Sequence, residues 1–170
     1  GALGLVKRQV DNESRFEIHS ISESAYDIGG DLHDYFMVDN NRLLFTVGDV
    51  SGKGIPAALF MIFAHTLLRS VGQGQLPVNE VVNTMNNRLI EDNISDLFVT
   101  LFVGILDLNT GELNYCNAAH CFPVLVRSQG IIEELSQSHG IPVGLYANRN
   151  YSQSTIKLNP NDMLIIYSDG

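Results

Sequence analysis

The sequence has 170 residues, 45% of them hydrophobic and 17% charged, a composition typical of one globular domain with a sizeable core. Its 10 basic and 19 acidic residues give a formal net charge of −9, which argues against nucleic acid as a partner and disfavours an anionic membrane surface. We therefore expect no nucleic-acid binding and no membrane insertion.

The apolar stretches and the cysteines lead us to expect a cytoplasmic protein. The longest apolar stretch, residues 55–68, is shorter than the roughly 20 residues that span a bilayer, and no secretory signal is visible. Cys116 and Cys121 are the only cysteines, and we interpret them as reduced thiols. With the neighbouring His120 they match no usual zinc-ligand spacing, so a zinc site is not expected.

The first part of the chain is predicted to consist of a short N-terminal segment followed by the start of a domain. Residues 1–14 are interpreted as a linker or a cloning remnant, and residues 3–10 suit the end of a linker helix. Residues 15–170 are assigned to one domain, which starts with an alternating strand over 15–22. An acidic loop is predicted over 27–34, where three aspartates surround a Gly-Gly pair that permits close backbone approach.

The central segment predicts strand, turn and helix. Strands are predicted over 35–38 and 42–48 with a turn between them, and the second strand delivers Asp49. A glycine-rich turn follows, and an apolar helix begins near Ile55 with Pro56 in its first turn. The glycine spacing fits neither a P-loop nor a dinucleotide fingerprint. A carboxylate at a strand end and backbone amides at a helix N-terminus instead suit a metal ion and a phosphate. For the turn taken alone, an ordinary strand-to-helix connection is the alternative.

The remaining elements predict an α+β fold. A second, amphipathic helix is expected over 78–89, where apolar residues recur at helical spacing. Residues 98–107 form a nearly unbroken apolar run, which indicates a strand covered on both faces. Further strands are expected at 112–118, 123–127, 131–135, 151–158 and 162–168. Many antiparallel strands with two helices inserted together are typical of the α+β class.

Four segments, GGDLHDYF, GDVSGKGIPAALFM, FVTLFVGILDLNTGELNYCNAAH and LIIYSDG, occur in the order found in a known family. They resemble the SpoIIE-type (RsbU-like) branch of the metal-dependent PPM serine/threonine protein phosphatases, from about Phe16 to the last residue. The resemblance implies two stacked antiparallel β-sheets flanked by helices, a four-layer sandwich. It also implies hydrolysis of phosphoserine or phosphothreonine on a bacterial regulatory protein of the anti-anti-sigma-factor type, and a possible upstream sensor domain.

The same resemblance implies the site residues. Two ions, Mn²⁺ or Mg²⁺, are expected, and Asp49 would bridge them. Asp31 and the Val50 carbonyl would complete one ion's ligands, and Asp169 would bind the other. The ions would activate the water that attacks phosphorus. Asp34 would orient water or the loop.

Two further residues are weaker candidates for the site, and the end of the sequence departs from the family's motif pattern. Lys53 is a weak candidate for binding the phosphate, His33 could protonate the leaving oxygen, and His120 is interpreted as structural. The family carries another aspartate beyond the SDG segment, whereas this sequence stops at Gly170. One metal site is therefore expected to be incomplete and a final strand to be missing, through truncation or degeneracy.

Two other functions compete with the phosphatase. The first is a catalytically weak regulatory module of the same fold that binds a partner, which the missing aspartate suggests. The second is a calcium-stabilised binding domain that uses Asp27, Asp31 and Asp34, although this stretch lacks the EF-hand spacing and its terminal glutamate.

Overall fold

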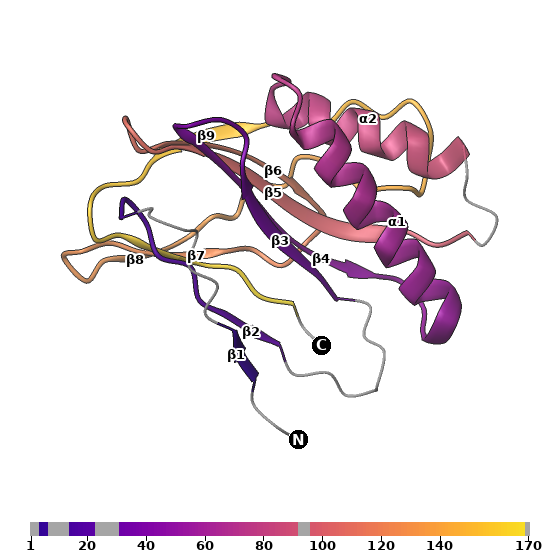
Figure 1. The fold of residues 1–170 in the computed structure, drawn as a ribbon, viewed down its shortest axis with the longest axis horizontal. Helices are drawn as coiled ribbons and strands as arrows, with labels where there is room; N and C mark the ends of the chain where they lie inside the picture. Colours follow the sequence, from indigo (N-terminus) through magenta and orange to yellow (C-terminus); the bar gives the residue numbers. More distant parts are fainter. Residues whose placement is uncertain (1–3, 7–13, 23–30, 92–95, 169–170) are drawn as a thin grey trace.

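The computed structural model describes residues 4–6, 14–22, 31–91 and 96–168 (Figure 1). The helices are α1 (Gly54–Gly72) and α2 (Val78–Glu91). The strands are β1 (Gly4–Val6), β2 (Ser20–Ser22), β3 (Asp31–Met37), β4 (Arg42–Val50), β5 (Val99–Asp107), β6 (Glu112–Ala118), β7 (Val124–Val126), β8 (Ile132–Glu134), β9 (Ser154–Lys157) and β10 (Met163–Ile165).

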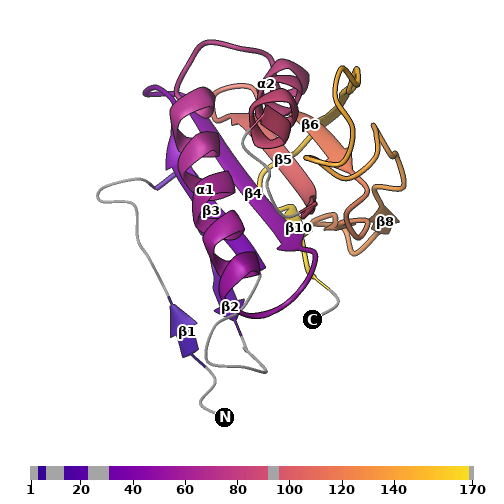
Figure 2. The same cartoon turned by 90° about the vertical axis from the view of Figure 1, so that its right-hand side faces the viewer.

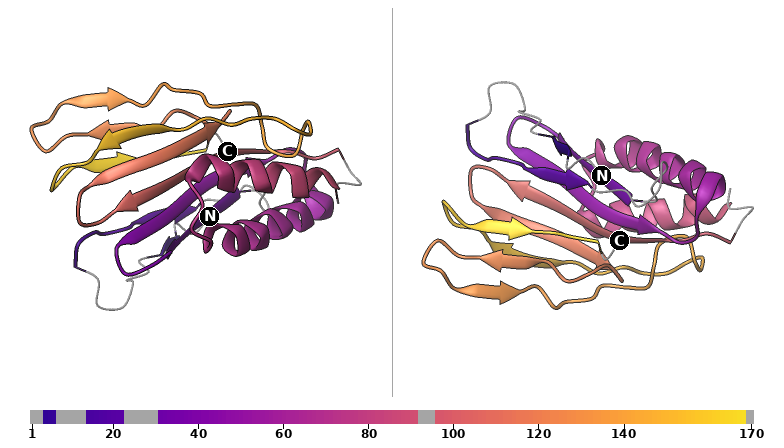
Figure 3. Two further views of the ribbon diagram at one scale, coloured as in Figure 1. Left: turned by 90° about the horizontal axis from the view of Figure 1, so that it is seen from above. Right: turned by 90° about the horizontal axis from the view of Figure 1, so that it is seen from below.

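The described elements form three layers. A five-stranded antiparallel sheet has the order β3-β4-β5-β6-β9, and α1 and α2 lie side by side on one of its faces (Figure 2). A three-stranded antiparallel sheet, β10-β7-β8, lies on the other side of it (Figure 3). The predicted pair of stacked antiparallel sheets with helices is confirmed, and within the described residues helices cover only the larger sheet.

Strand alternation divides the core into two clusters, one on each face of the larger sheet. Leu44, Leu68, Met85 and Leu101 belong to the cluster under the helices, where all four are fully buried. The cluster between the sheets contains Phe102, Leu113, Tyr115, Leu125 and Leu135. Because β5 contributes to both clusters, the prediction that residues 98–107 are covered on both faces is confirmed.

The predicted apolar helix is confirmed as α1, which begins one residue earlier than expected. Its buried side packs on the sheet through Ala57, Phe60, Ala64, Leu67, Leu68 and Val71. By length and composition its 19 residues could cross a membrane, so the argument from a short apolar stretch was wrong. One such helix is weak support for a span, because core helices of soluble proteins pass the same test.

Three local predictions near the N-terminus were wrong. Residues 4–6 form a strand rather than a linker helix, and the strand predicted over 15–22 is reduced to β2. β1 pairs with β2, and the predicted division of the chain at residue 14 stays a prediction. The acidic stretch 31–34 belongs to β3 rather than to a loop, because its backbone pairs with β4. Asp27, Gly29 and Gly30 lie outside the described residues.

The polar face predicted for the second helix is only partly solvated. Asn86 is fully buried, and its side chain accepts a hydrogen bond from Gly144 N–H at 2.9 Å and donates one to the Tyr146 carbonyl at 2.9 Å. Asn83 accepts a further bond from Tyr151 N–H at 2.8 Å. These asparagines therefore attach the segment 144–151 to α2.

Candidate metal centre

Asp31 and Asp49 lie directly opposite each other on neighbouring antiparallel strands. Asp31 is the first residue of β3, and its register partner is Asp49, the next-to-last residue of β4. Side chains opposite each other in such a pair lie on one face, with Cβ atoms about 4.5–5.5 Å apart. Both residues are partly exposed. This spacing allows one cation to contact both carboxylates.

The two carboxylates lie on the face that looks towards the smaller sheet. Leu32 and Val50, the next residues along the two strands, belong to the core cluster under the helices. Because side chains alternate along a strand, Asp31 and Asp49 point away from the helices. Asp169, the third carboxylate implied by the resemblance, lies outside the described residues, so its place in the site stays a prediction.

The turn after Asp49 is held by two hydrogen bonds and contains backbone conformations that favour glycine. Ser51 N–H donates to the Phe98 carbonyl at 2.8 Å, and Phe98 N–H donates to Ser51 Oγ at 2.9 Å. Gly52 and Gly54 have φ of 87° and 74°, a region that L-residues with side chains rarely adopt. The exposed Lys53 between them is the N-cap residue of α1. It lies beside the backbone amides at the helix N-terminus, which are the predicted phosphate-binding groups.

Asp34 lies on the opposite face of β3 from Asp31. Its carboxylate accepts bonds from Arg69 Nε at 2.5 Å and Arg69 Nη2 at 2.7 Å, and pairs with His65 Nε2 at 2.7 Å. Both partners belong to α1. Its predicted role in orienting water stays a prediction, whereas its contacts connect β3 to the helix. The i, i+4 spacing of His65 and Arg69 in an apolar helix was the sequence signal for this cluster.

Burial of the Asp34 carboxylate, which is 9% exposed, tends to raise its pKa. The hydrogen bonds and charges of Arg69 and His65 outweigh this effect, and the pKa of Asp34 is lowered from its ordinary 3.8. The charged form is therefore favoured by folding. This stabilisation is fully present above pH 3.8 and is lost as the pH falls through the lowered pKa.

Substitution of Arg69 tests this ion pair. We expect Arg69→Ala to lower the free energy of unfolding at pH 7 by about 1–2 kcal/mol, because Asp34 loses two charged hydrogen bonds while Arg69 itself is partly solvated. Urea denaturation measures the change, with the exposed Arg88→Ala as the control. The difference from wild type should shrink as the pH falls below the pKa of Asp34. A difference that stays constant in acid would contradict the assignment.

The remaining candidates separate into exposed and buried groups. His33 is exposed and shares the face of Asp31, two residues along β3. Cys116 is buried and its pKa is raised to about 12 by burial, and neither it nor Cys121 forms a disulfide. His120 is buried, and its Nδ1 lies 3.0 Å from Thr100 Oγ1. Thr100 was not predicted as a site residue from the sequence. In the structure it is the register partner of Asp49 on β5.

The donor chemistry fits a hard divalent cation. Carboxylate and carbonyl oxygens of Asp31, Asp49 and Val50 are the ligands that Mg²⁺ and Mn²⁺ prefer. Within the described residues no group of three His, Cys, Asp or Glu side chains could hold a metal by itself. The described part of the chain thus offers two adjacent carboxylates. The calcium alternative is weakened, because its Asp31 and Asp34 lie on opposite faces of β3.

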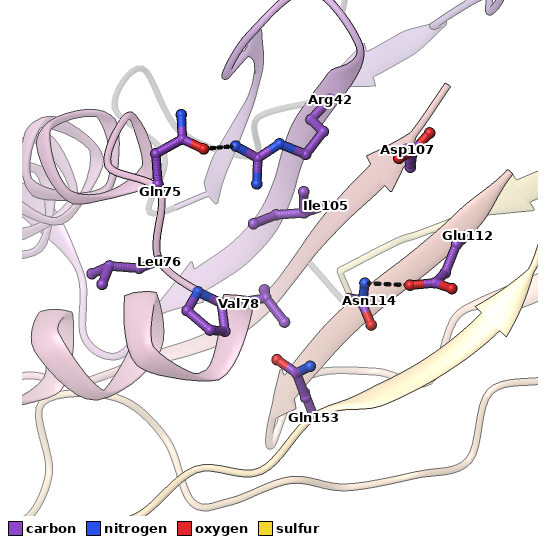
Figure 4. Close-up of a pocket in the computed structure, with 10 residues that line it drawn as sticks. Arg42, Gln75, Leu76, Val78, Ile105, Asp107, Glu112, Asn114 and Gln153 are labelled. Carbon is purple, nitrogen blue, oxygen red and sulfur yellow. Dashed lines mark hydrogen bonds between the residues drawn. The ribbon is translucent and has the colours of Figure 1, made fainter. Parts of the chain in front are cut away.

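A pocket of about 320 Å³ lies at the other end of the larger sheet (Figure 4). Arg42 and Asp107 at its rim are register partners, at the opposite end of β4 from Asp49. The Arg42 guanidinium donates hydrogen bonds to the side chains of Gln75 and Asp39. The Asp107 carboxylate accepts hydrogen bonds from the backbone N–H groups of Asn109 and Thr110 in the following turn. These polar groups therefore serve local structure, and the pocket is separate from the paired carboxylates.

Comparison with known proteins relates the chain to phosphatases. The sequence profile of stage II sporulation protein E (SpoIIE) matches residues 39–170. Protein IcfG of Synechocystis is 30% identical over 92% of this chain, and phosphoserine phosphatase RsbU of Bacillus subtilis is 28% identical over 98%. The structure of the RsbU and RsbW domains of Rv1364c from Mycobacterium tuberculosis superposes with a TM-score of 0.77 and 29% identity.

The chain corresponds to only part of each of these proteins. It spans 29% of the length of IcfG and 49% of RsbU. It covers 41% of the Rv1364c chain, which aligns with 87% of this one. The likeness therefore concerns one domain within longer proteins.

Proposed function

Because this chain belongs to the stage II sporulation protein E (SpoIIE) family, we propose that it is a metal-dependent protein phosphatase acting on phosphoserine or phosphothreonine. The observation that carries the proposal is the cross-strand pair of Asp31 and Asp49, two carboxylates on one face at the end of the larger sheet. The similarity to RsbU, a phosphoserine phosphatase, supports the same reaction class.

In the proposed mechanism Asp31, Asp49 and the Val50 carbonyl would hold Mn²⁺ or Mg²⁺, and Asp169 would be a further ligand. Such ions supply Lewis acidity and lower the pKa of bound water towards neutrality, which provides a nucleophile for the phosphate ester. Lys53 and the amides at the start of α1 hold the phosphate by charge and hydrogen bonds. In a chain of net charge −9, these local positive groups counter the repulsion of an anionic substrate.

The proposed substrate is a phosphorylated bacterial regulatory protein of the anti-anti-sigma-factor type, in the cytoplasm. This proposal follows the family resemblance and the similarity to RsbU. The family resemblance adds an upstream sensor domain to the proposal, as the part of the protein that would control the activity. The alternative is a regulatory module that keeps the fold and binds such a partner with little turnover.

Phosphate release tests the proposed function. The chain is incubated with a phosphoserine peptide and with a small aryl phosphate, in Mn²⁺, in Mg²⁺ and in excess EDTA. We expect release with the divalent ions and none with EDTA. A chain that binds Mn²⁺ by calorimetry but releases no phosphate from either substrate would contradict the enzyme and favour the regulatory module.

A further inference from the structure

A row of polar side chains crosses three strands at the end of the larger sheet that carries the carboxylates. Asp31 pairs with Asp49, and Asp49 in turn pairs with Thr100 on β5. Residues opposite each other in antiparallel strands share a face, so Thr100 lies beside Asp49 on the side of Asp31. Its neighbours Val99 and Leu101 belong to the core under the helices, which agrees with this orientation.

His120 extends the row from the loop that follows β6. Its Nδ1 lies 3.0 Å from Thr100 Oγ1, and the residue is only 5% exposed. His120 N–H donates to Asn117 Oδ1 at 2.8 Å, and Asn117 is fully buried. Ala119, which precedes it, has a φ of 59°, a left-handed conformation unusual for alanine. Strained backbone and buried anchors together specify where the imidazole lies.

We infer that Thr100 and His120 are positioning residues for Asp49, an inference that rests on the proposed function. The imidazole Nδ1–H donates to Thr100 Oγ1, and the hydroxyl donates in turn to the Asp49 carboxylate, which can only accept. The hydroxyl thereby orients the carboxylate towards the cation. Hydrogen-bond partners of metal ligands contribute in this way, and their removal typically costs 10–100-fold in metal affinity or activity.

A purely structural role for the pair predicts something different. In that case the Thr100–His120 bond only fastens the loop after β6 to β5, and its loss lowers stability without changing the affinity for metal. The chain offers a matched control for this alternative. Thr46 is 2% exposed and donates to the Phe102 carbonyl at 2.8 Å, and its register partner Asp34 faces the helices.

The experiment compares Thr100→Val, Thr100→Ser and Thr46→Val in the full 170-residue chain. The dissociation constant for Mn²⁺ is measured from the electron paramagnetic resonance signal of the free ion. The melting temperature is measured without metal, and phosphate release at saturating Mn²⁺. We expect Thr100→Val to bind Mn²⁺ about 10–100-fold more weakly, because Asp49 loses its hydroxyl partner. Thr100→Ser should restore the affinity, and Thr46→Val should lower the melting temperature alone.

Two substitutions at His120 complete the test. His120→Asn retains an N–H donor close to the Nδ1 position and should keep the affinity for Mn²⁺, whereas His120→Leu should behave like Thr100→Val. Unchanged Mn²⁺ affinity in Thr100→Val would overturn the inference, as would an equal loss in Thr46→Val. If the variants change Mn²⁺ affinity as expected but the wild-type chain releases no phosphate, the proposed enzymatic function would be overturned and the positioning role would stand.

Discussion

Asp49→Asn should lower the rate of phosphate release by more than about 100-fold. Even the hydrogen-bond partners of a metal ligand typically contribute about 10–100-fold to metal affinity or activity, and the ligand itself should contribute more. The amide has nearly the shape of the carboxylate but lacks its negative charge, which contributes most to binding a divalent cation. Asp31→Asn should cause a comparable loss, since its carboxylate lies opposite Asp49 in the register. Initial rates at saturating Mn²⁺ measure both effects.

The double variant sharpens this prediction. Residues that hold one ion act as a unit, so Asp31→Asn combined with Asp49→Asn should fall little below either single variant. Asp107→Asn is the control, because Asp107 accepts hydrogen bonds from a turn at the far end of β5, and asparagine can accept them too. If the two losses multiplied, the carboxylates would act separately and a shared cation would be excluded.

Gly48→Ala should damage both the fold and the site. A Cβ atom at Gly48 would lie 2.7 Å from the Thr100 carbonyl oxygen, closer than real Cβ contacts allow, and 3.0 Å from Leu101 Cδ1, which is a tight contact. Since the obstacle is backbone of the neighbouring strand, β4 must move relative to β5. We expect a loss of about 1–3 kcal/mol in unfolding free energy. We also expect phosphate release to fall by roughly 100-fold, because Asp49 is the next residue and small misplacements of catalytic groups are costly.

Gly104→Ala separates instability from damage to the site. Its Cβ would lie 2.6 Å from Phe45 Cζ and 3.0 Å from Leu113 Cδ1, which are side-chain atoms on the same sheet but further from the carboxylates. This variant should lose stability and keep its rate of phosphate release per folded molecule. Urea denaturation gives the stability, and rates are compared at a temperature where both variants are folded. Equal rate losses would attribute the effect of Gly48→Ala to instability.

Prediction of the fold succeeded where the signal is local. The β6 strand was predicted with its observed limits, and both helices lie within a few residues of the expected ranges. Apolar periodicity, glycine-rich turns and Pro56 act over a few residues, so short windows of sequence contain this information. The short β1 was missed and the strand that contains β2 was predicted too long, because β1 and β2 pair with each other across an intervening stretch of chain that a short window does not include.

Local patterns in the sequence predict that Asp49 lies at the end of a strand before a helix and that Asp31 lies in an acidic stretch. The three-dimensional structure was needed to show that these two carboxylates are cross-strand partners and that Asp34 faces the other way, towards Arg69. The reason is that strand register sets which side chains share a face, and a shift of one residue would reverse it. Register depends on contacts along the whole sheet, so no single motif could place Thr100 beside Asp49.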